Sequence, residues 1–216
     1  MKLQKLGGYA SIVSACVTIT IIILLSLMFQ GPQGGLDFYD PVKMIDNYRA
    51  SATSFKACYI LDILGAIVTL IIAIALEERM KADAPILMRV VVIAASAYSV
   101  LVITASIGGF FRNELLAATN DMSAFRAFLV LHEFLHGAAK HILGWGYLLI
   151  SWSAIKTRKL PPILSCIIFI YALVLIIGFL FTVSQMIFGI GIPLLLGIII
   201  FLWLGIYLLR NPEPNK

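Results

Sequence analysis

Six long apolar segments dominate this chain and constrain its fold more than any other feature. They cover about residues 9–29, 53–75, 86–107, 124–155, 163–184 and 193–209. A bilayer hydrocarbon core about 30 Å thick is crossed by about 20 apolar residues in a helix. A helix also satisfies its own backbone polar groups, as a lipid-exposed segment must. We therefore predict an all-α, polytopic membrane helix bundle with six transmembrane helices, forming a single domain over residues 1–216.

The composition supports a membrane protein and argues against other classes. Of the 216 residues, 61% are hydrophobic and 12% are charged, whereas soluble domains carry about 25% charged residues. The net charge of +5 does not indicate nucleic-acid binding, because the basic residues flank apolar segments and form no patch. The expected partner is the lipid bilayer, with no nucleic acid. Cys16, Cys58 and Cys166 lie within apolar segments, as small packing residues do.

Short helices at the membrane surface are expected between the apolar segments. Asp40 and Pro41 have the pattern of a helix cap followed by a first-turn proline, which predicts a short helix over about Pro41–Tyr48. The third segment is expected to stop at Gly108-Gly109, with a second short helix over Phe110–Leu116. Ser123 is the expected cap of the fourth transmembrane helix.

The distribution of basic residues between the loops predicts the orientation. One set of loops and ends holds ten lysines and arginines and the other holds five. The larger set is Lys2, Lys5, Arg79, Lys81, Arg89, Lys156, Arg158, Lys159, Arg210 and Lys216; the smaller is Lys43, Arg49, Lys56, Arg112 and Arg126. Because basic loops stay in the cytoplasm, we predict that both termini are cytoplasmic and that the protein resides in the plasma membrane.

The fourth segment holds all three histidines of the chain on a helix that also carries other polar groups. At 100° per residue, one face of the helix holds Arg126, His132, Glu133, His136 and Lys140. His141 falls on the opposite side and is not expected to join the other two histidines. Charged groups inside a membrane normally face protein or water, so this face is expected to point into the bundle.

Depth along the helices suggests a partner for this polar face. Asp62 lies about 9 Å inward from Lys56 on the second helix, and Glu133 lies about 10 Å inward from Arg126 on the fourth. Tyr59 lies one turn from Asp62. We therefore predict a polar pocket in the outer half of the bundle, formed by Asp62, His132, Glu133, His136, Lys140, Tyr59 and Arg126.

Three interpretations of this pocket stay open. The pattern His132-Glu133-x-x-His136 is that of zinc peptidases, in which two histidines hold the metal and the glutamate, here Glu133, activates a water. Zinc needs a third protein ligand, and Asp62 or Glu114 would have to supply it without a recognisable spacing. A haem protein draws histidines from facing helices, whereas these histidines share one helix.

The favoured interpretation is a pocket without chemistry or cofactor, for binding, transport or sensing. It needs no missing ligand, and it accounts for Arg126 and Lys140 as well as for the histidines. The expected partner besides lipid is a small ligand or another membrane protein. Whether the protein is an enzyme stays open, with the non-enzymatic role preferred and zinc kept as the alternative cofactor.

Two stretches also carry a family resemblance. Phe55–Gly65 opens the second helix with an aromatic-basic start and Asp62-Ile63-Leu64-Gly65. Leu143–Leu149 is a glycine-rich helix end, followed by a basic loop and Leu160–Leu164. This layout resembles the domain of unknown function 4386 family of small six-helix membrane proteins over nearly the whole chain. The resemblance implies no activity, cofactor or substrate, and the zinc-peptidase pattern is not part of it, but it does single out Asp62.

Overall fold

The computed structural model describes residues 3–29, 41–119, 121–181 and 192–211. The predicted all-α class is confirmed for these residues, since every regular element among them is a helix. The helices are α1 (Leu3–Phe29), α2 (Pro41–Met80), α3 (Pro85–Thr119), α4 (Met122–Thr157), α5 (Pro162–Phe181) and α6 (Ile192–Arg210). The predicted cap Asp40 and the end of the fifth apolar segment lie outside the described residues.

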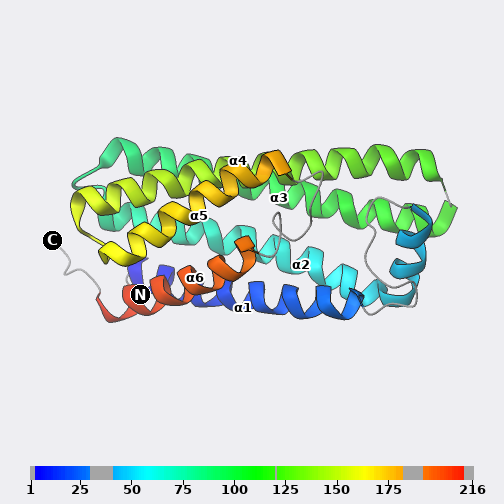
Figure 1. Ribbon diagram of the computed structural model, residues 1–216, viewed down its shortest axis with the longest axis horizontal. Coiled ribbons are helices and arrows are strands. Elements are labelled where there is room, and N and C mark those ends of the chain that lie inside the picture. The colour runs from blue at the N-terminus through cyan, green and yellow to red at the C-terminus, as the bar shows by residue number, and fades with distance from the viewer. Residues whose placement is uncertain (1–2, 30–40, 120, 182–191, 212–216) are drawn as a thin grey trace.

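The six helices form an elongated bundle in which neighbours in sequence are neighbours in space (Figure 1). Each of α1 to α5 packs on the helix that follows it, and α6 also packs on α1, which closes a ring. Short connections, such as residues 81–84 between α2 and α3, favour antiparallel packing of consecutive helices. Across the ring, α2 and α4 contact each other over a short stretch.

Small residues set the closest approach between helices. A Cβ atom at Gly205 of α6 would lie 2.9 Å from the carbonyl oxygen of Gly8 on α1 and 2.8 Å from Cγ1 of Ile12. Only a glycine fits there, and membrane helices commonly pack through such small residues. Between α2 and α3, the Ser99 hydroxyl donates a hydrogen bond of 2.8 Å to the carbonyl oxygen of Ala66.

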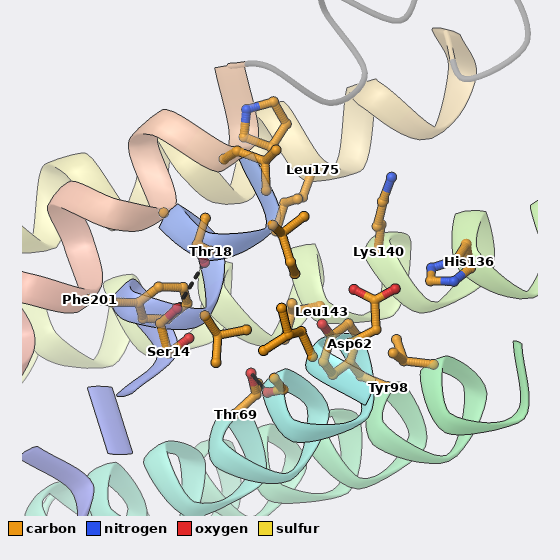
Figure 2. Close-up of a pocket in the computed structure, with 18 of the residues that line it drawn as sticks. Ser14, Thr18, Asp62, Thr69, Tyr98, His136, Lys140, Leu143, Leu175 and Phe201 are labelled. Carbon is orange, nitrogen blue, oxygen red and sulfur yellow. Dashed lines mark hydrogen bonds between the residues drawn. The ribbon is translucent and has the colours of Figure 1, made fainter. Parts of the chain in front are cut away.

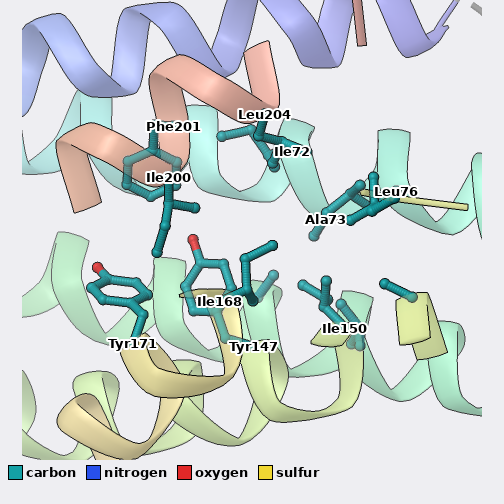
Figure 3. Close-up of a cluster of buried hydrophobic side chains, with 14 of the residues drawn as sticks. Ile72, Ala73, Leu76, Tyr147, Ile150, Ile168, Tyr171, Ile200, Phe201 and Leu204 are labelled. Atoms are coloured by element: carbon teal, nitrogen blue, oxygen red, sulfur yellow. The ribbon is translucent and has the colours of Figure 1, made fainter. Parts of the chain in front are cut away.

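Two apolar clusters fill the two ends of the bundle. The larger, near the chain termini, draws residues from all six helices and includes Ile72, Leu76, Ile168, Ile200 and Leu204 (Figure 3). The smaller, at the opposite end, contains Met28, Ile45, Tyr48, Phe55, Leu116, Phe125 and Leu129 from the first four helices. Many large apolar side chains instead point outward, as surfaces in contact with lipid do.

Four helices within the described ranges are long and apolar enough to cross a membrane. They are α1, α2, α3 and α6, and the described part of α5 adds a shorter apolar helix, Pro162–Gly178. This pattern indicates a membrane protein, as the composition predicts.

The predicted break at Gly108-Gly109 and the separate helix over Phe110–Leu116 are wrong, because α3 continues without interruption to Thr119. A glycine inside a helix costs only about 1 kcal/mol relative to alanine. Beyond the glycines, Arg112 and Leu116 are buried against the start of α4 and the smaller apolar cluster. That tertiary packing stabilises the continued helix.

The ends of two other helices refine the sequence predictions. The predicted short helix over Pro41–Tyr48 forms the first part of α2, up to a kink at Ser51 (φ −135°, ψ 30°), and lies across the end of the bundle (Figure 1). The cap of α4 is Asp121, whose carboxylate accepts hydrogen bonds from the backbone N–H groups of Ser123 and Ala124, both at 3.0 Å. These bonds hold the pKa of the Asp121 carboxyl below its ordinary value.

Candidate functional site

A cavity of about 170 Å³ lies inside the ring, and all six helices contribute to its wall. Since a water molecule occupies about 30 Å³ in the liquid, this volume holds about five or six waters or one small molecule. The polar part of the wall consists of Ser14, Thr18, Asp62, Thr69, Tyr98, His136, Lys140 and Tyr171 (Figure 2). An interior cavity with this many polar groups is suited to a polar occupant.

Asp62 of α2 and Lys140 of α4 are the charged groups of this wall. Within the described part of the chain, neither makes a hydrogen bond or an ion pair. They are nonetheless close enough to interact electrostatically, and Lys140 interacts in the same way with Glu133. An unpaired charge in a membrane costs about 2.5–3.5 kcal/mol on insertion scales. The charged forms of both groups are therefore costly unless the contents of the cavity compensate them.

The two histidines of the polar face of α4 lie next to each other, one turn apart. The ring centroids of His132 and His136 are 4.6 Å apart, and His136 reaches the cavity wall. His132 lies one turn further out, where its Nδ1 donates a 2.9 Å hydrogen bond to the carbonyl oxygen of Ala105 on α3. Because a carbonyl only accepts, this bond fixes the proton on Nδ1 and leaves Nε2 free.

The Tyr59 ring of α2 packs edge-on against His132, with ring centroids 6.3 Å apart. Gly109 of α3 makes this contact possible. A Cβ at that position would lie 2.7 Å from Cε1 of Tyr59 and 3.0 Å from Cε1 of His132. The site thus continues outward from the cavity as a closely packed layer between α2, α3 and α4.

A buried arginine supports this layer, and the sequence analysis missed it. Arg112 is only 3% exposed; its Nε donates to Oδ1 of Asn113 at 3.0 Å and its Nη2 to the Tyr59 hydroxyl at 3.3 Å. Asn113 Nδ2 donates to the same hydroxyl at 2.9 Å. Arg112 was expected in a separate short helix over Phe110–Leu116, whereas it lies within the continuous helix α3. Residues 105, 109, 112 and 116 are spaced as on one face of a helix. This spacing was the sequence signal that Arg112 shares a buried face with the residues before the glycine pair.

The structure brings together part of the predicted pocket. Asp62, His136 and Lys140 line one cavity, with Tyr59 and His132 in the adjoining layer. Counting residues along the helices placed Asp62 at the same depth as Glu133. In the structure the electrostatic partner of Asp62 on α4 is instead Lys140, which lies two turns further along that helix.

The remaining polar residues of α4 lie off the cavity wall. Glu133 is partly buried and interacts electrostatically with Lys140 and Arg112. Arg126 is exposed near the start of α4 and lines no part of the cavity. His141 lies against Trp145, whose Nε1 donates a 3.1 Å hydrogen bond to its Nε2.

Several hydroxyl groups of the cavity wall were not predicted. Ser14 and Thr18 of α1 both line the cavity. Tyr98 and Tyr171 come from α3 and α5, and neither hydroxyl bonds to another described residue. No periodicity distinguishes these tyrosines from other aromatic residues in apolar segments, so only the tertiary structure identifies them.

The metal-binding interpretation depends on a third ligand. Among the residues that the structure describes, no three His, Cys, Asp or Glu side chains are grouped so that they could hold a metal ion. In this described part of the chain, no third protein ligand of the kind that a catalytic zinc uses lies with His132 and His136. One feature does match a metal ligand, because metal-bound histidines usually donate their second ring N–H to a carbonyl or carboxylate, as His132 does to Ala105.

Comparisons of the chain with protein-family models, curated proteins and solved structures find no match.

Proposed function

We propose that this chain is a six-span membrane protein that binds a small polar solute in the cavity between its helices, for transport or sensing. The observation that carries the proposal is the unpaired state of Asp62 and Lys140, which face one cavity inside an apolar bundle. Such charges are costly unless the occupant of the cavity compensates them. The resemblance to the domain of unknown function 4386 family is in keeping with six spans and adds no substrate.

Helix lengths support a position for this cavity in the outer half of the membrane. Leu76 and Ile155 are the last apolar residues before the charged ends of α2 and α4. Counted from them at 1.5 Å per residue, Asp62 and Lys140 each lie about 21–23 Å along their helices. The hydrocarbon core is about 30 Å thick, so both charges come to lie at a matching depth beyond its middle.

The proposed orientation places both termini in the cytoplasm of a cell whose plasma membrane holds the protein. Besides the loop charges, its support is Arg79, whose Nη1 donates to Oε1 of Gln4 at 3.3 Å and to the carbonyl oxygen of Asn211 at 2.8 Å. These contacts bring residues near both ends to one side of the bundle. Reporter fusions at both ends test the orientation, and an external C-terminus would contradict it.

Water access to the cavity is the direct test of the proposed function. In a variant without Cys16, Cys58 and Cys166, Thr18→Cys places a thiol in the cavity wall. Ile19→Cys is the matched control, because it has the same depth but points outward (Ile19 is 39% exposed). A small cationic methanethiosulfonate reagent should modify Thr18→Cys and spare Ile19→Cys. Equal reaction rates, or no reaction at Thr18→Cys, would refute a solute-filled cavity.

An intramembrane zinc peptidase that uses His132, Glu133 and His136 is the second candidate. The orientation of His132 favours this candidate. Its Nδ1 donates to the carbonyl oxygen of Ala105, as the second ring nitrogen of a metal-bound histidine usually does, and its Nε2 is left to bind a metal. Glu133 would activate the water, and Asp62 would have to move to become the third ligand. Zinc would supply the Lewis acid for peptide hydrolysis.

A further inference from the structure

The charged groups of the cavity gather at one end of it. Asp62, His136 and Lys140 lie together, whereas Phe201 lines the wall away from them (Figure 2). Asp62 comes from α2 and Lys140 from α4, so a negative and a positive group belong to facing helices. Neither is paired with a described residue, although each is within electrostatic range of the other.

The charges in and beside the cavity balance. Asp62 and Glu133 are acidic, and Lys140 and Arg112 are basic, and electrostatic interactions connect Asp62 with Lys140, Lys140 with Glu133, and Glu133 with Arg112. In a low-dielectric interior an added net charge would upset this balance. An occupant with no net charge keeps it.

A net-neutral occupant that pairs an opposite charge with each of Asp62 and Lys140 carries one charge of each sign. Resting on the proposed function, we propose that the cavity binds a small zwitterion, with its ammonium group at Asp62 and its carboxylate at Lys140. The Tyr98 and Tyr171 hydroxyls, which are without partners among the described residues, supply further hydrogen bonds. Leu175 and Phe201 receive an apolar side chain, and the volume of about 170 Å³ has room for a ligand of amino-acid size.

Binding of three matched probes tests this assignment. L-leucine carries both charges, 3-methylbutylamine lacks the carboxylate, and 4-methylpentanoate lacks the ammonium group. Titration calorimetry on the purified full chain in detergent should show L-leucine, or the smaller L-alanine, binding at least about tenfold more tightly than either single-charge analogue. Glu78→Gln, at a surface ion pair with Lys81, should leave these affinities unchanged.

Two variants should change the selectivity in opposite ways. Asp62→Asn should bind L-leucine no better than 4-methylpentanoate, and Lys140→Met should bind it no better than 3-methylbutylamine. The comparison is internal to each variant, so a partial loss of stability does not obscure it. An amine that binds as tightly as L-leucine, together with an unaffected Lys140→Met variant, would overturn the zwitterion in favour of a cation site.

The outcomes also separate this inference from the proposed function. If Thr18→Cys is accessible from water but neither L-leucine nor L-alanine binds up to millimolar concentration, the zwitterion is wrong and the solute-filled cavity stands. If Thr18→Cys is inaccessible, the proposed function fails and the zwitterion site fails with it.

Discussion

Replacing Gly109 with alanine is a sensitive test of the layer between the cavity and the outer end of the bundle. The added Cβ would lie 2.7 Å from Cε1 of Tyr59 and 3.0 Å from Cε1 of His132. The Tyr59 ring cannot easily move away, because its hydroxyl accepts hydrogen bonds from Arg112 and Asn113. Overpacking of this kind costs about 1–3 kcal/mol.

The neighbouring Gly108 is a matched control for the backbone effect of the substitution. A Cβ there would meet nothing within 4 Å, so Gly108→Ala should stabilise the helix by up to about 1 kcal/mol. Gly109→Ala gains the same helix propensity but also suffers the clash. The free energies of unfolding of the two variants should therefore differ by about 1–3 kcal/mol.

Reversible denaturant unfolding in detergent micelles measures this difference. A Tyr59→Leu background supplies a second check, since removing the ring should relieve most of the cost of Gly109→Ala. Coupling between the two positions is then visible as non-additivity. Equal stabilities of the two glycine variants, or additive effects with Tyr59→Leu, would refute the packing described for this layer.

Three further predictions concern the ends of the bundle and the metal. Arg79→Ala should lower the unfolding free energy by at least about 2 kcal/mol, because buried charged hydrogen bonds are lost, whereas the exposed Arg89→Ala should change it by less than about 0.5 kcal/mol. Because folding lowers the pKa of the Asp121 carboxyl, this cap stabilises α4 fully at pH values above the ordinary pKa of an aspartate, and the stabilisation is lost as the pH falls through the lowered pKa. The difference in unfolding free energy between the natural chain and Asp121→Ala should therefore vanish in acid. Elemental analysis should find no stoichiometric zinc; about one zinc per chain, lost in His132→Ala, would overturn the cofactor-free pocket in favour of a zinc site.

Local sequence signals located the helices but not all of their ends. Apolar length predicted the helical segments, and α2 continues past its apolar part as a helix to Met80, in agreement with the sequence. The glycine pair at residues 108 and 109 is a local signal for a break, and there the prediction failed. Its effect on the helix is about 1 kcal/mol per glycine, and the burial of Arg112 and Leu116 outweighs it.

The sequence by itself determined the class of the protein and the polar face of α4. Both follow from quantities that depend on one segment at a time: apolar length, charge content and the angular position of each residue on its helix. The same local geometry predicted that His132 and His136 lie side by side and that His141 points away from them. In the structure the rings of His132 and His136 contact each other, and His141 contacts Trp145 instead.

Only the tertiary structure decided which polar groups meet. Which depth on α4 faces Asp62 depends on how α2 and α4 are shifted along each other. The close contacts of Gly109 on α3 with both Tyr59 on α2 and His132 on α4 fix that shift. The ring closure by α6 against α1 then brings residues from all six helices around one cavity. Contacts between segments far apart in the chain leave no periodic signal in either segment, and for this reason the cavity appears only in the folded bundle.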